Sequence, residues 1–329
     1  MEGMTLPRRS FSSGFANFNR SYFIVYALVG LAVVFTILSP GTFMTAPNIM
    51  TIIKQASVVA IVAAGQFFVL TGGDFDLSVG STVSLSGMIF AGSLVIWGIH
   101  PGPAALFAVL AGLGVGFLNG FLVSRVGLPA FIGTLASMMS VKGVALLLTL
   151  ARPINKIPGT VAWIGRGVIG DILVFGVPYM TVIMAIVIIT VFVITEKTNF
   201  GRYVFAMGGN REAAYLSGIN IKNFKVFTYL ISGGLASLAS IILVSRLAVG
   251  DPYSGDGYEF ESITACVIGG TAITGGKGKI LAVLVGAIFL SMLFNGFTQL
   301  NVNTFIQQVL KGVILAVAVT MDTMKNKKG

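Results

Sequence analysis

Long apolar stretches, separated by short polar turns, run along almost the whole chain. A helix needs roughly 20 apolar residues to cross the hydrocarbon core of a bilayer, because each residue adds about 1.5 Å. Stretches of that scale without Asp, Glu, Lys or Arg recur at 21–53, 55–73, 77–124, 172–195, 226–245 and 280–310. The pattern therefore predicts an all-α fold, a polytopic transmembrane helical bundle.

Turn residues divide these stretches into about ten transmembrane helices. We expect them at 22–38, 49–70, 77–99, 104–123, 131–150, 179–194, 226–249, 262–273, 280–295 and 304–321. They form one transmembrane domain, 21–322, between an amino-terminal tail (1–20) and a short carboxyl tail (323–329). The connector 151–178 is too rich in Pro and Gly for a plain span. The glycine run 112–116 is typical of a close-packing helix face.

The composition agrees with a membrane protein. Of the 329 residues, 55% are hydrophobic and 10% are charged, and the mean hydropathy is +0.94, whereas soluble domains carry about 25% charged residues. The net charge of +10 is spread over connectors and ends. Basic residues distributed in this way typically set the orientation of a protein in the membrane, so no nucleic-acid partner is expected. Cys266 is the only cysteine, so no disulfide can form within the chain.

One polar segment, 195–225, stands out between two apolar stretches. It holds five of the 21 basic residues and two acids, Glu196 and Glu212. A basic connector of this kind is expected on the cytoplasmic side of a membrane. Within it, 211–217 is typical of a short helix that has Asn210 as its N-cap and Gly218 as its stop. We interpret this segment as a cytoplasmic loop on which a soluble partner docks.

The distribution of charge predicts the topology. With about ten helices, the two chain ends, the 195–225 segment and the 277–279 turn fall on one side, and all four are basic. The acidic connector 250–261 falls on the opposite side. This arrangement predicts cytoplasmic amino and carboxyl termini. The connector 151–178 is the exception, because it falls outside and yet holds three basic residues.

Three short motifs occur twice in the same order. Asn-Gly-Phe at 119–121, Phe-Ile at 131–132 and Lys-Gly-Val at 142–144 return at 295–297, 305–306 and 311–313. The spacings differ by several residues, so either chance or an internal repeat accounts for the echo. A repeat would relate helices that run in opposite directions, as in the inverted-topology repeats of transporters.

Charged and polar residues at membrane depth are the candidates for a substrate path. Asp74 and Asp76 lie at a glycine break between two helices, and Lys142 and Lys311 lie within helices, where charge is costly. These groups either line a hydrated path, or they form hydrogen bonds with the free backbone groups of helix ends and pair with one another. Neutral polar side chains on the helices suit an uncharged, hydroxyl-rich solute or helix-to-helix hydrogen bonds equally well. They are Gln66, Asn119, Asn295, Gln307 and Gln308.

The chain has few residues for catalysis. His100 is the only histidine, so no histidine-based triad or metal cluster is expected. No GxxxxGK[ST] phosphate-binding motif occurs, so uphill transport needs an ion gradient or a separate ATPase, and no cofactor of the chain itself is expected. Two alternatives stay open. One is an ion-coupled secondary transporter that uses the Asp and Lys residues at membrane depth, and the other is a membrane-embedded enzyme.

Several motifs resemble the permeases of ABC importers. Glu212-Ala213-Ala214 followed by Gly218 resembles the coupling loop of these permeases, although the Ile-x-Leu-Pro ending of many such loops is absent. Further motifs resemble the ribose-type, simple-sugar branch. They are Gly65-Gln66, 71–80, 129–135, Phe200-Gly201-Arg202, Gly208-Gly209-Asn210, Ser217-Gly218-Ile219, Gly257-Tyr258-Glu259 and 267–271. One departure is an extra residue in 72–80, where Asp76 matches the branch better than Asp74 does.

The resemblance implies a transport subunit, not an enzyme, that moves ribose or a similar simple sugar across the inner membrane of a bacterial cell. It implies three partners: a cytoplasmic ATPase that binds the ATP, a periplasmic or lipid-anchored sugar-binding protein, and a second permease copy or related permease. The implied ATPase-coupling residues are Arg202, Gly208, Gly209, Asn210, Glu212, Ala213, Ala214, Ser217 and Gly218. The expected substrate-path residues are Gln66, Asp74, Asp76, Asn119 and Asn295.

Overall fold

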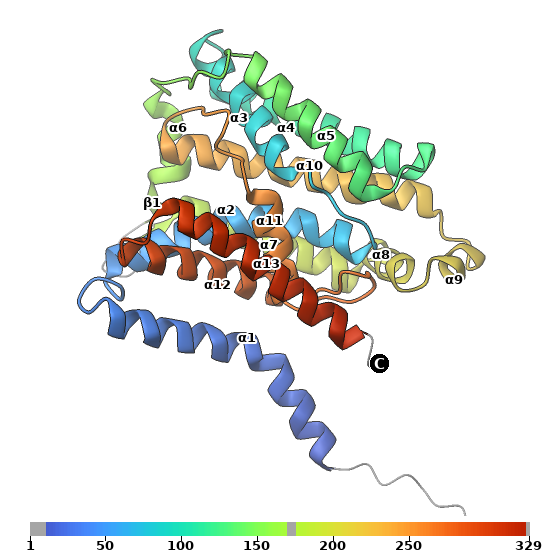
Figure 1. Ribbon diagram of the computed structural model, residues 1–329. Helices are drawn as coiled ribbons and strands as arrows, with labels where there is room; N and C mark the ends of the chain where they lie inside the picture. Colours follow the sequence, from blue (N-terminus) through green and yellow to red (C-terminus); the bar gives the residue numbers. More distant parts are fainter. Residues whose placement is uncertain (1–10, 170–175, 327–329) are drawn as a thin grey trace, which may run out of the picture.

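A computed structural model describes residues 11–169 and 176–326, and the side chains between residues 24 and 324 outside that gap. The described chain is almost entirely helical (Figure 1). Its α-helices are α1 (Phe11–Leu38), α2 (Ala46–Thr71), α3 (Val79–Val95), α4 (Pro101–Phe121), α5 (Ala130–Leu147), α6 (Gly159–Arg166), α7 (Tyr179–Lys197), α8 (Asn199–Gly209), α9 (Arg211–Leu216), α10 (Ile221–Leu247), α11 (Tyr258–Ile268), α12 (Ile280–Gln299) and α13 (Thr304–Asn326). A π-helical turn, η1 (Leu122–Val126), extends α4, and two short strands, β1 (Val168–Ile169) and β2 (Val177–Pro178), pair antiparallel.

The predicted helical bundle is confirmed, and each of the ten expected ranges overlaps a helix. Within the described residues, seven helices are long and apolar enough to cross a membrane: α2, α4 with η1, α5, α7, α10, α12 and α13. α3 and the apolar part of α1 are shorter, and α11 has only 11 residues. The expected number of about ten spans is therefore not confirmed, because apolar composition predicts a span even where the helix is short.

The predicted tails are only partly described. Residues 11–20 of the expected amino-terminal tail belong to α1, so that helix begins well before the first apolar stretch. In the carboxyl tail, α13 continues to Asn326. Residues 1–10 and 327–329 lie outside the described residues.

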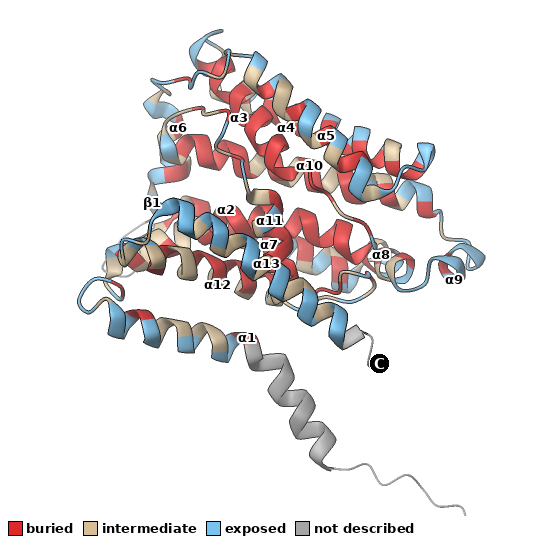
Figure 2. Ribbon diagram, viewed as in Figure 1, coloured by how far each residue is buried: buried red, intermediate tan, exposed pale blue. Residues whose placement is uncertain are grey.

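α2 and α10 form the centre of the bundle. In α2, 83% of the most apolar stretch is buried, and in α10 61% is buried, against 28% in α5 and none in α13 (Figure 2). The sequence explains the position of α2, because small and branched residues, all apolar except Ser57, fill 56–64 on every side of the helix. Pro47 lies in its first turn and Gly72 follows its last, as is typical of helix ends.

The helices on either side of this centre pack in two matching sets. α10 packs against α4 and α3, and α2 packs against α12 and α11. Within each set the order repeats, since α3 contacts α4 and α5 while α11 contacts α12 and α13. α4 and α12 run in opposite directions across the bundle (Figure 1).

The expected close-packing face of α4 is confirmed at two of its three glycines. A Cβ atom on Gly112 would lie 2.4 Å from the Gly233 carbonyl oxygen, and one on Gly116 would lie 2.3 Å from that of Tyr229. Gly114 faces open space. α4 and α10 therefore touch backbone to backbone, which only glycine permits.

Different elements close the two ends of the bundle. α8 and α9 lie at one end with the carboxyl end of α13, and α6 and β1 lie at the other (Figure 1). We call these the α8–α9 end and the α6 end. The connector predicted not to span holds α6 and the two strands, and its Ile154 pairs with Gly250 through backbone hydrogen bonds of 2.7 and 2.9 Å.

Candidate functional site

The basic 195–225 segment is folded into helices and is not an open loop. α7 runs to Lys197, α8 and α9 follow, and α10 begins at Ile221. Apolar side chains at helical spacing explain the correction, because Val204 and Met207 form a buried face of α8. The segment therefore presents a shaped surface to a partner.

The short helix expected at 211–217 is present as α9, and its ends are the predicted ones. The Asn210 side-chain oxygen accepts a hydrogen bond of 3.0 Å from the Ala213 amide, as an N-cap does. Gly218 adopts φ +82°, a left-handed conformation that ends a helix. Ser217 donates its hydroxyl to the Ala213 carbonyl oxygen at 2.8 Å.

Most of the expected coupling residues lie on the surface. Arg202, Gly209, Asn210, Glu212, Ala213, Ser217 and Gly218 are exposed, Gly208 is half-buried and Ala214 is buried. Tyr215 and Leu216 also lie on this surface, with 70% and 78% of their area exposed. The sequence interpretation missed these two, although two large apolar residues in an otherwise polar segment are a signal for a docking surface.

Three pairs of glycines join α8 to the interior. A Cβ atom on Gly208 would lie 1.9 Å from the Thr71 carbonyl oxygen and 2.7 Å from the Gly276 nitrogen. The Gly276 amide donates a 2.8 Å hydrogen bond to the same Thr71 oxygen. On Gly275, a Cβ atom would lie 2.8 Å from the Gly73 Cα atom. We call this meeting of Gly72-Gly73, Gly208-Gly209 and Gly275-Gly276 the diglycine junction.

Asp74 forms a buried ion pair directly beside the junction. Its two carboxylate oxygens lie 2.7 and 2.6 Å from Lys225 Nζ, and the side chains are 11% and 7% exposed. Lys225 belongs to the second turn of α10. The sequence analysis counts Asp74 among the substrate-path candidates and Lys225 among the basic residues of the 195–225 segment. The ion pair joins the break between α2 and α3 to the end of that segment.

Asp76 is the centre of a second buried group. Its Oδ1 atom accepts hydrogen bonds from the Ser78 amide (3.0 Å) and hydroxyl (2.7 Å), and Asn119 Nδ2 lies 3.5 Å away. Its Oδ2 atom accepts one from Ser232 at 2.8 Å. The Gln66 amide pairs with the Asp76 backbone when its nitrogen faces the carbonyl oxygen, 3.0 Å away, and its oxygen faces the amide, 3.3 Å away. Side chains of α2, α4 and α10 thus converge on one residue of the break.

Asn295 lies apart from the other four expected path residues. Its side-chain oxygen accepts a 2.9 Å hydrogen bond from Asn48 Nδ2, near the start of α2. Asn48 in turn accepts one of 2.8 Å from Gln299. The structure therefore brings Gln66, Asp74, Asp76 and Asn119 together at the break and leaves Asn295 in a separate polar group.

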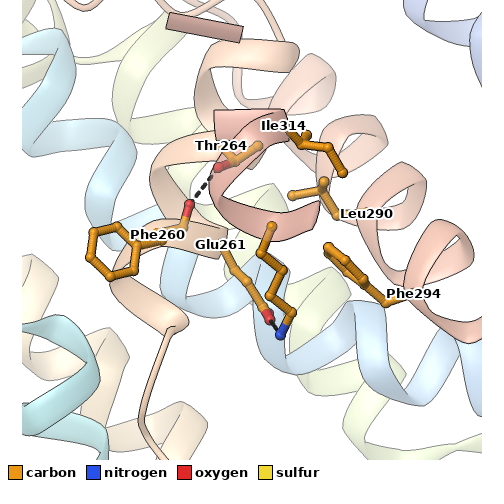
Figure 3. A pocket seen from close by; sticks show the side chains of 7 residues that line it. Phe260, Glu261, Thr264, Leu290, Phe294 and Ile314 are labelled. Atoms are coloured by element: carbon orange, nitrogen blue, oxygen red, sulfur yellow. Dashed lines mark hydrogen bonds and ion pairs between the residues drawn. The ribbon is translucent and has the colours of Figure 1, made fainter. Parts of the chain in front are cut away.

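The two lysines at membrane depth pair with acids near the start of α11. Lys142 Nζ contacts the Asp256 carboxylate and donates to the Pro252 carbonyl oxygen at 2.7 Å. Lys311 Nζ lies 2.5 Å from Glu261 Oε1 (Figure 3). Both pairings join residues more than 40 positions apart, and the sequence interpretation had not named either acid as a partner.

Comparison with known proteins identifies the family. Residues 48–319 match the family described as "Branched-chain amino acid transport system / permease component". The chain belongs to this permease family. It is 38% identical over 306 residues to the ribose import permease protein RbsC of Escherichia coli K12. The aligned region covers 92% of this chain and 93% of that protein. It is 32% identical to the xylose transport system permease protein XylH of Haemophilus influenzae Rd (93% and 97% covered) and 34% identical to the D-allose transport system permease protein AlsC of E. coli K12 (95% and 94%).

The match to the permease family begins in the first turn of α2 and ends within α13. It therefore includes the diglycine junction, the Asp76 group and the α8–α9 surface, and it confirms the resemblance drawn from the sequence motifs. The family match and the long apolar helices together indicate a multi-pass membrane protein. No solved structure gives a significant match.

Proposed function

We propose that this chain is the membrane permease subunit of an ABC importer that takes up a simple sugar of the ribose type. The observation that carries the proposal is the similarity along more than nine-tenths of the chain to permeases named for ribose, xylose and allose. The family description names branched-chain amino acids. The sugar names of the relatives decide the substrate class.

The α8–α9 surface is the docking site of the ATPase in this proposal. Glu212 and the exposed Tyr215 and Leu216 combine a charge with apolar area, which is the composition of an interface core and its rim. The short side chain of Ala213 lets a partner approach the backbone closely. ATP is bound by that partner, so this subunit needs no cofactor of its own.

The diglycine junction transmits the motion of the docked ATPase. Gly208 contacts both the end of α2 and the α11–α12 turn without any intervening side chain. A displacement of α8 must therefore move the break between α2 and α3 or open the junction. Asp74 and Lys225 add a second link between the same elements. Packed backbones of this kind switch between arrangements and do not bend gradually.

The expected path residues are closed off in this conformation. Gln66, Asp76 and Asn119 are at most 1% exposed and bond to one another. We assign them to the wall of the substrate path at the α2–α3 break, so that they reach the sugar only when this break opens. Asp74 is held by Lys225 in the same way.

The charge at the two ends supports the proposed orientation. Lys197, Arg202, Arg211 and Lys222 lie in or beside α8 and α9. The α6 end holds Asp251, on the connector that pairs with Ile154, and also the three basic residues of the 151–178 connector, which are the exception to the charge rule. The basic end of a membrane protein faces the cytoplasm. The α8–α9 end and both chain termini are therefore cytoplasmic, and the α6 end receives the sugar-binding protein.

The two matching sets of helices support an inverted-topology repeat. α2 to α5 correspond to α10 to α13, and the paired contacts are the same in each set. The correspondence pairs the helix that carries Asn119 with the one that carries Asn295, and the helix of Lys142 with that of Lys311, as the echo in the sequence does. α5 and α13 are the least buried of the long spans, and we assign their exposed faces to the interface with a second permease.

Uptake by the assembled transporter tests the proposed function. The chain is reconstituted in vesicles with its ATPase, ATP is enclosed, and the binding protein and a radiolabelled sugar are added outside. We expect ATP-dependent accumulation of D-ribose, D-xylose or D-allose, and no accumulation with a non-hydrolysable nucleotide. Accumulation of leucine but of none of the three sugars would contradict the substrate class.

A further inference from the structure

Two lysines of the outermost helices each contact a carboxylate and an aromatic ring. Lys142 of α5 contacts the Asp256 carboxylate, and its Nζ atom lies 4.6 Å from the centre of the Tyr253 ring. Lys311 of α13 contacts Glu261, and its Nζ atom lies 4.9 Å from the centre of the Phe294 ring. We call these three-residue groups the Lys142 cluster and the Lys311 cluster. Each combines an ammonium group, a carboxylate and an aromatic face.

The two clusters lie at similar depth. Lys142 is five residues from the end of α5 and Lys311 is seven residues from the start of α13. At about 1.5 Å per residue, these positions are roughly 8 and 10 Å along the helix axis. Both of these helix ends lie toward the α6 end (Figure 1). The clusters therefore occupy the half of the bundle that faces away from α8 and α9.

These charges are not positioned to face lipid. The side chains of Lys142 and Asp256 are 21% and 54% exposed, and those of Lys311 and Glu261 are 36% and 17% exposed. A charge facing hydrocarbon costs at least about 2.5 kcal/mol on insertion scales. Lysines often avoid this cost by extending toward the membrane surface, but here both amino groups bond acids at the start of α11. The exposed parts of the clusters therefore face water or a polar solute, which agrees with a path between the two permeases proposed to meet at α5 and α13.

The chemistry beside Lys311 suits a neutral sugar. A hollow is lined by Phe260, Glu261, Thr264, Leu290, Phe294, Lys311 and Ile314 (Figure 3). Sugar hydroxyls donate hydrogen bonds to a carboxylate and accept them from an ammonium group, and aromatic rings cover the apolar faces of sugar rings. The hollow measures about 10 Å³, no more than one water needs. The Lys311–Glu261 pair must therefore open before a sugar enters.

We propose that the Lys311 cluster is a sugar-contacting site in the outer half of the path, with the Lys142 cluster as its counterpart across α11. This inference rests on the proposed function. A hydroxyl donates to Glu261 as Lys311 releases it, and a second hydroxyl accepts from Lys311. Both charges thus stay hydrogen-bonded with the site closed or occupied, and no proton is transferred.

Labelling of a single cysteine tests whether sugar reaches this site. Cys266 is fully buried, so the unaltered protein should not react with a thiol reagent. Ile314→Cys places a thiol in the hollow, one turn from Lys311. In the complete transporter turning over ATP, we expect it to react with a membrane-impermeant sulfonated maleimide. D-ribose, D-xylose or D-allose, whichever is taken up, should slow the reaction about tenfold at about ten times its half-saturating concentration, because about one site in ten then stays unoccupied.

The Lys311→Met change distinguishes sugar contact from a structural role. In Ile314→Cys/Lys311→Met, the thiol should still react but lose its protection by sugar. Uptake by Lys311→Met should fall about tenfold, while Leu110→Met, on the exposed face of α4, should leave uptake unchanged. Leu110→Cys, on the exposed face of α4, is the control for a position facing lipid and should not react.

Three results would overturn the inference. They are an unreactive Ile314→Cys, protection that persists in Ile314→Cys/Lys311→Met, and full uptake by Lys311→Met. If Ile314→Cys fails to accumulate in the membrane, Thr264→Cys is a smaller change in the same hollow and gives the same reading. Should the unaltered transporter take up none of the three sugars, the proposed function fails first, and the inference fails with it.

Discussion

The central helices α2 and α10 and the outer helices α5 and α13 are all long and apolar, yet they hold charge in opposite ways. Lys225, on α10, and Asp74, just after α2, are 7% and 11% exposed and are joined through both carboxylate oxygens. At the outer helices, Lys311 is 36% exposed and Asp256, the partner of Lys142, is 54% exposed. Burial of the charge, and not its presence, separates the two regions.

The difference indicates which region forms the frame and which can rearrange. A buried charge cannot lose its partner without a large cost, so the Asp74–Lys225 pair fixes the break between α2 and α3 to α10. Each outer pair has one partner that is more exposed, and an ion pair open to water contributes little to stability and exchanges its partner readily. The centre therefore transmits motion from α8 and α9 as a unit, while the outer clusters can open for a solute.

Removing one partner of the central pair should have the largest effect on stability. Lys225→Met leaves the Asp74 carboxylate buried and unpaired, and we expect a loss of about 3–5 kcal/mol. Lys222→Met, three residues earlier in the same helix but exposed, is the matched control. Thermal unfolding in detergent measures both. Equal stability of the two variants would show that the pair does not hold the centre together.

A methyl group in the diglycine junction should have the next largest effect. Gly208→Ala places Cβ 1.9 Å from the Thr71 carbonyl oxygen, and overpacking of this kind costs about 1–3 kcal/mol. Gly209→Ala meets only the Gly276 Cα atom at 3.8 Å, so it should be neutral, or slightly stabilising because alanine favours helix. Comparing the abundance and unfolding of these neighbouring variants tests the junction. If Gly208→Ala is as stable and abundant as Gly209→Ala, the diglycine junction does not need the close backbone contact at Gly208.

Asp76→Asn should have a smaller effect on stability and a clear effect on transport. An asparagine keeps the oxygen that accepts from Ser78, and its amide nitrogen can donate to the Ser232 hydroxyl, so the expected loss is about 1 kcal/mol. We expect weaker sugar uptake while the ATPase still co-purifies with the permease. If the variant instead fails to insert or to assemble, Asp76 belongs to the scaffold and not to the path.

Glu212→Lys should barely change stability, within about 0.5 kcal/mol, because the residue lies on the surface. It should nevertheless abolish ATP-driven uptake, because it reverses the charge in the proposed docking surface. Co-purification of the ATPase and uptake are measured together, and Lys156→Met, a charge change at the opposite end, is the control for co-purification. Normal uptake by Glu212→Lys at normal abundance would contradict docking on α9.

The sequence predicted what depends on local pattern. Helices appear within a few residues of most expected ranges, and Asn210 and Gly218 bound α9 as expected, because capping needs only near neighbours in the chain. The helical nature of α8 could have been predicted from Val204 and Met207. The expectation of a loop at 195–225 rests on its basic residues, which indicate the side of the membrane and carry no information about helical periodicity.

What the sequence could not predict depends on contacts between distant segments. Asp74 and Lys225 are 151 positions apart, and many lysines and acids could have formed that pair. The diglycine junction joins three segments whose glycines are each explained locally as helix ends. The count of spans is not confirmed for a related reason, because α3 and α11 are apolar enough to span but are shortened by breaks that only packing fixes in place.

Transport by the bare permease tests the central claim most directly. The claim is that this chain is a path without a motor and that an ATPase docked on α8 and α9 drives it. D-ribose accumulation is measured in vesicles that contain the permease alone under an imposed proton or sodium gradient, and in vesicles that also contain the ATPase, the binding protein and ATP. We predict accumulation only in the second preparation. Accumulation by the permease alone under either gradient would contradict the account.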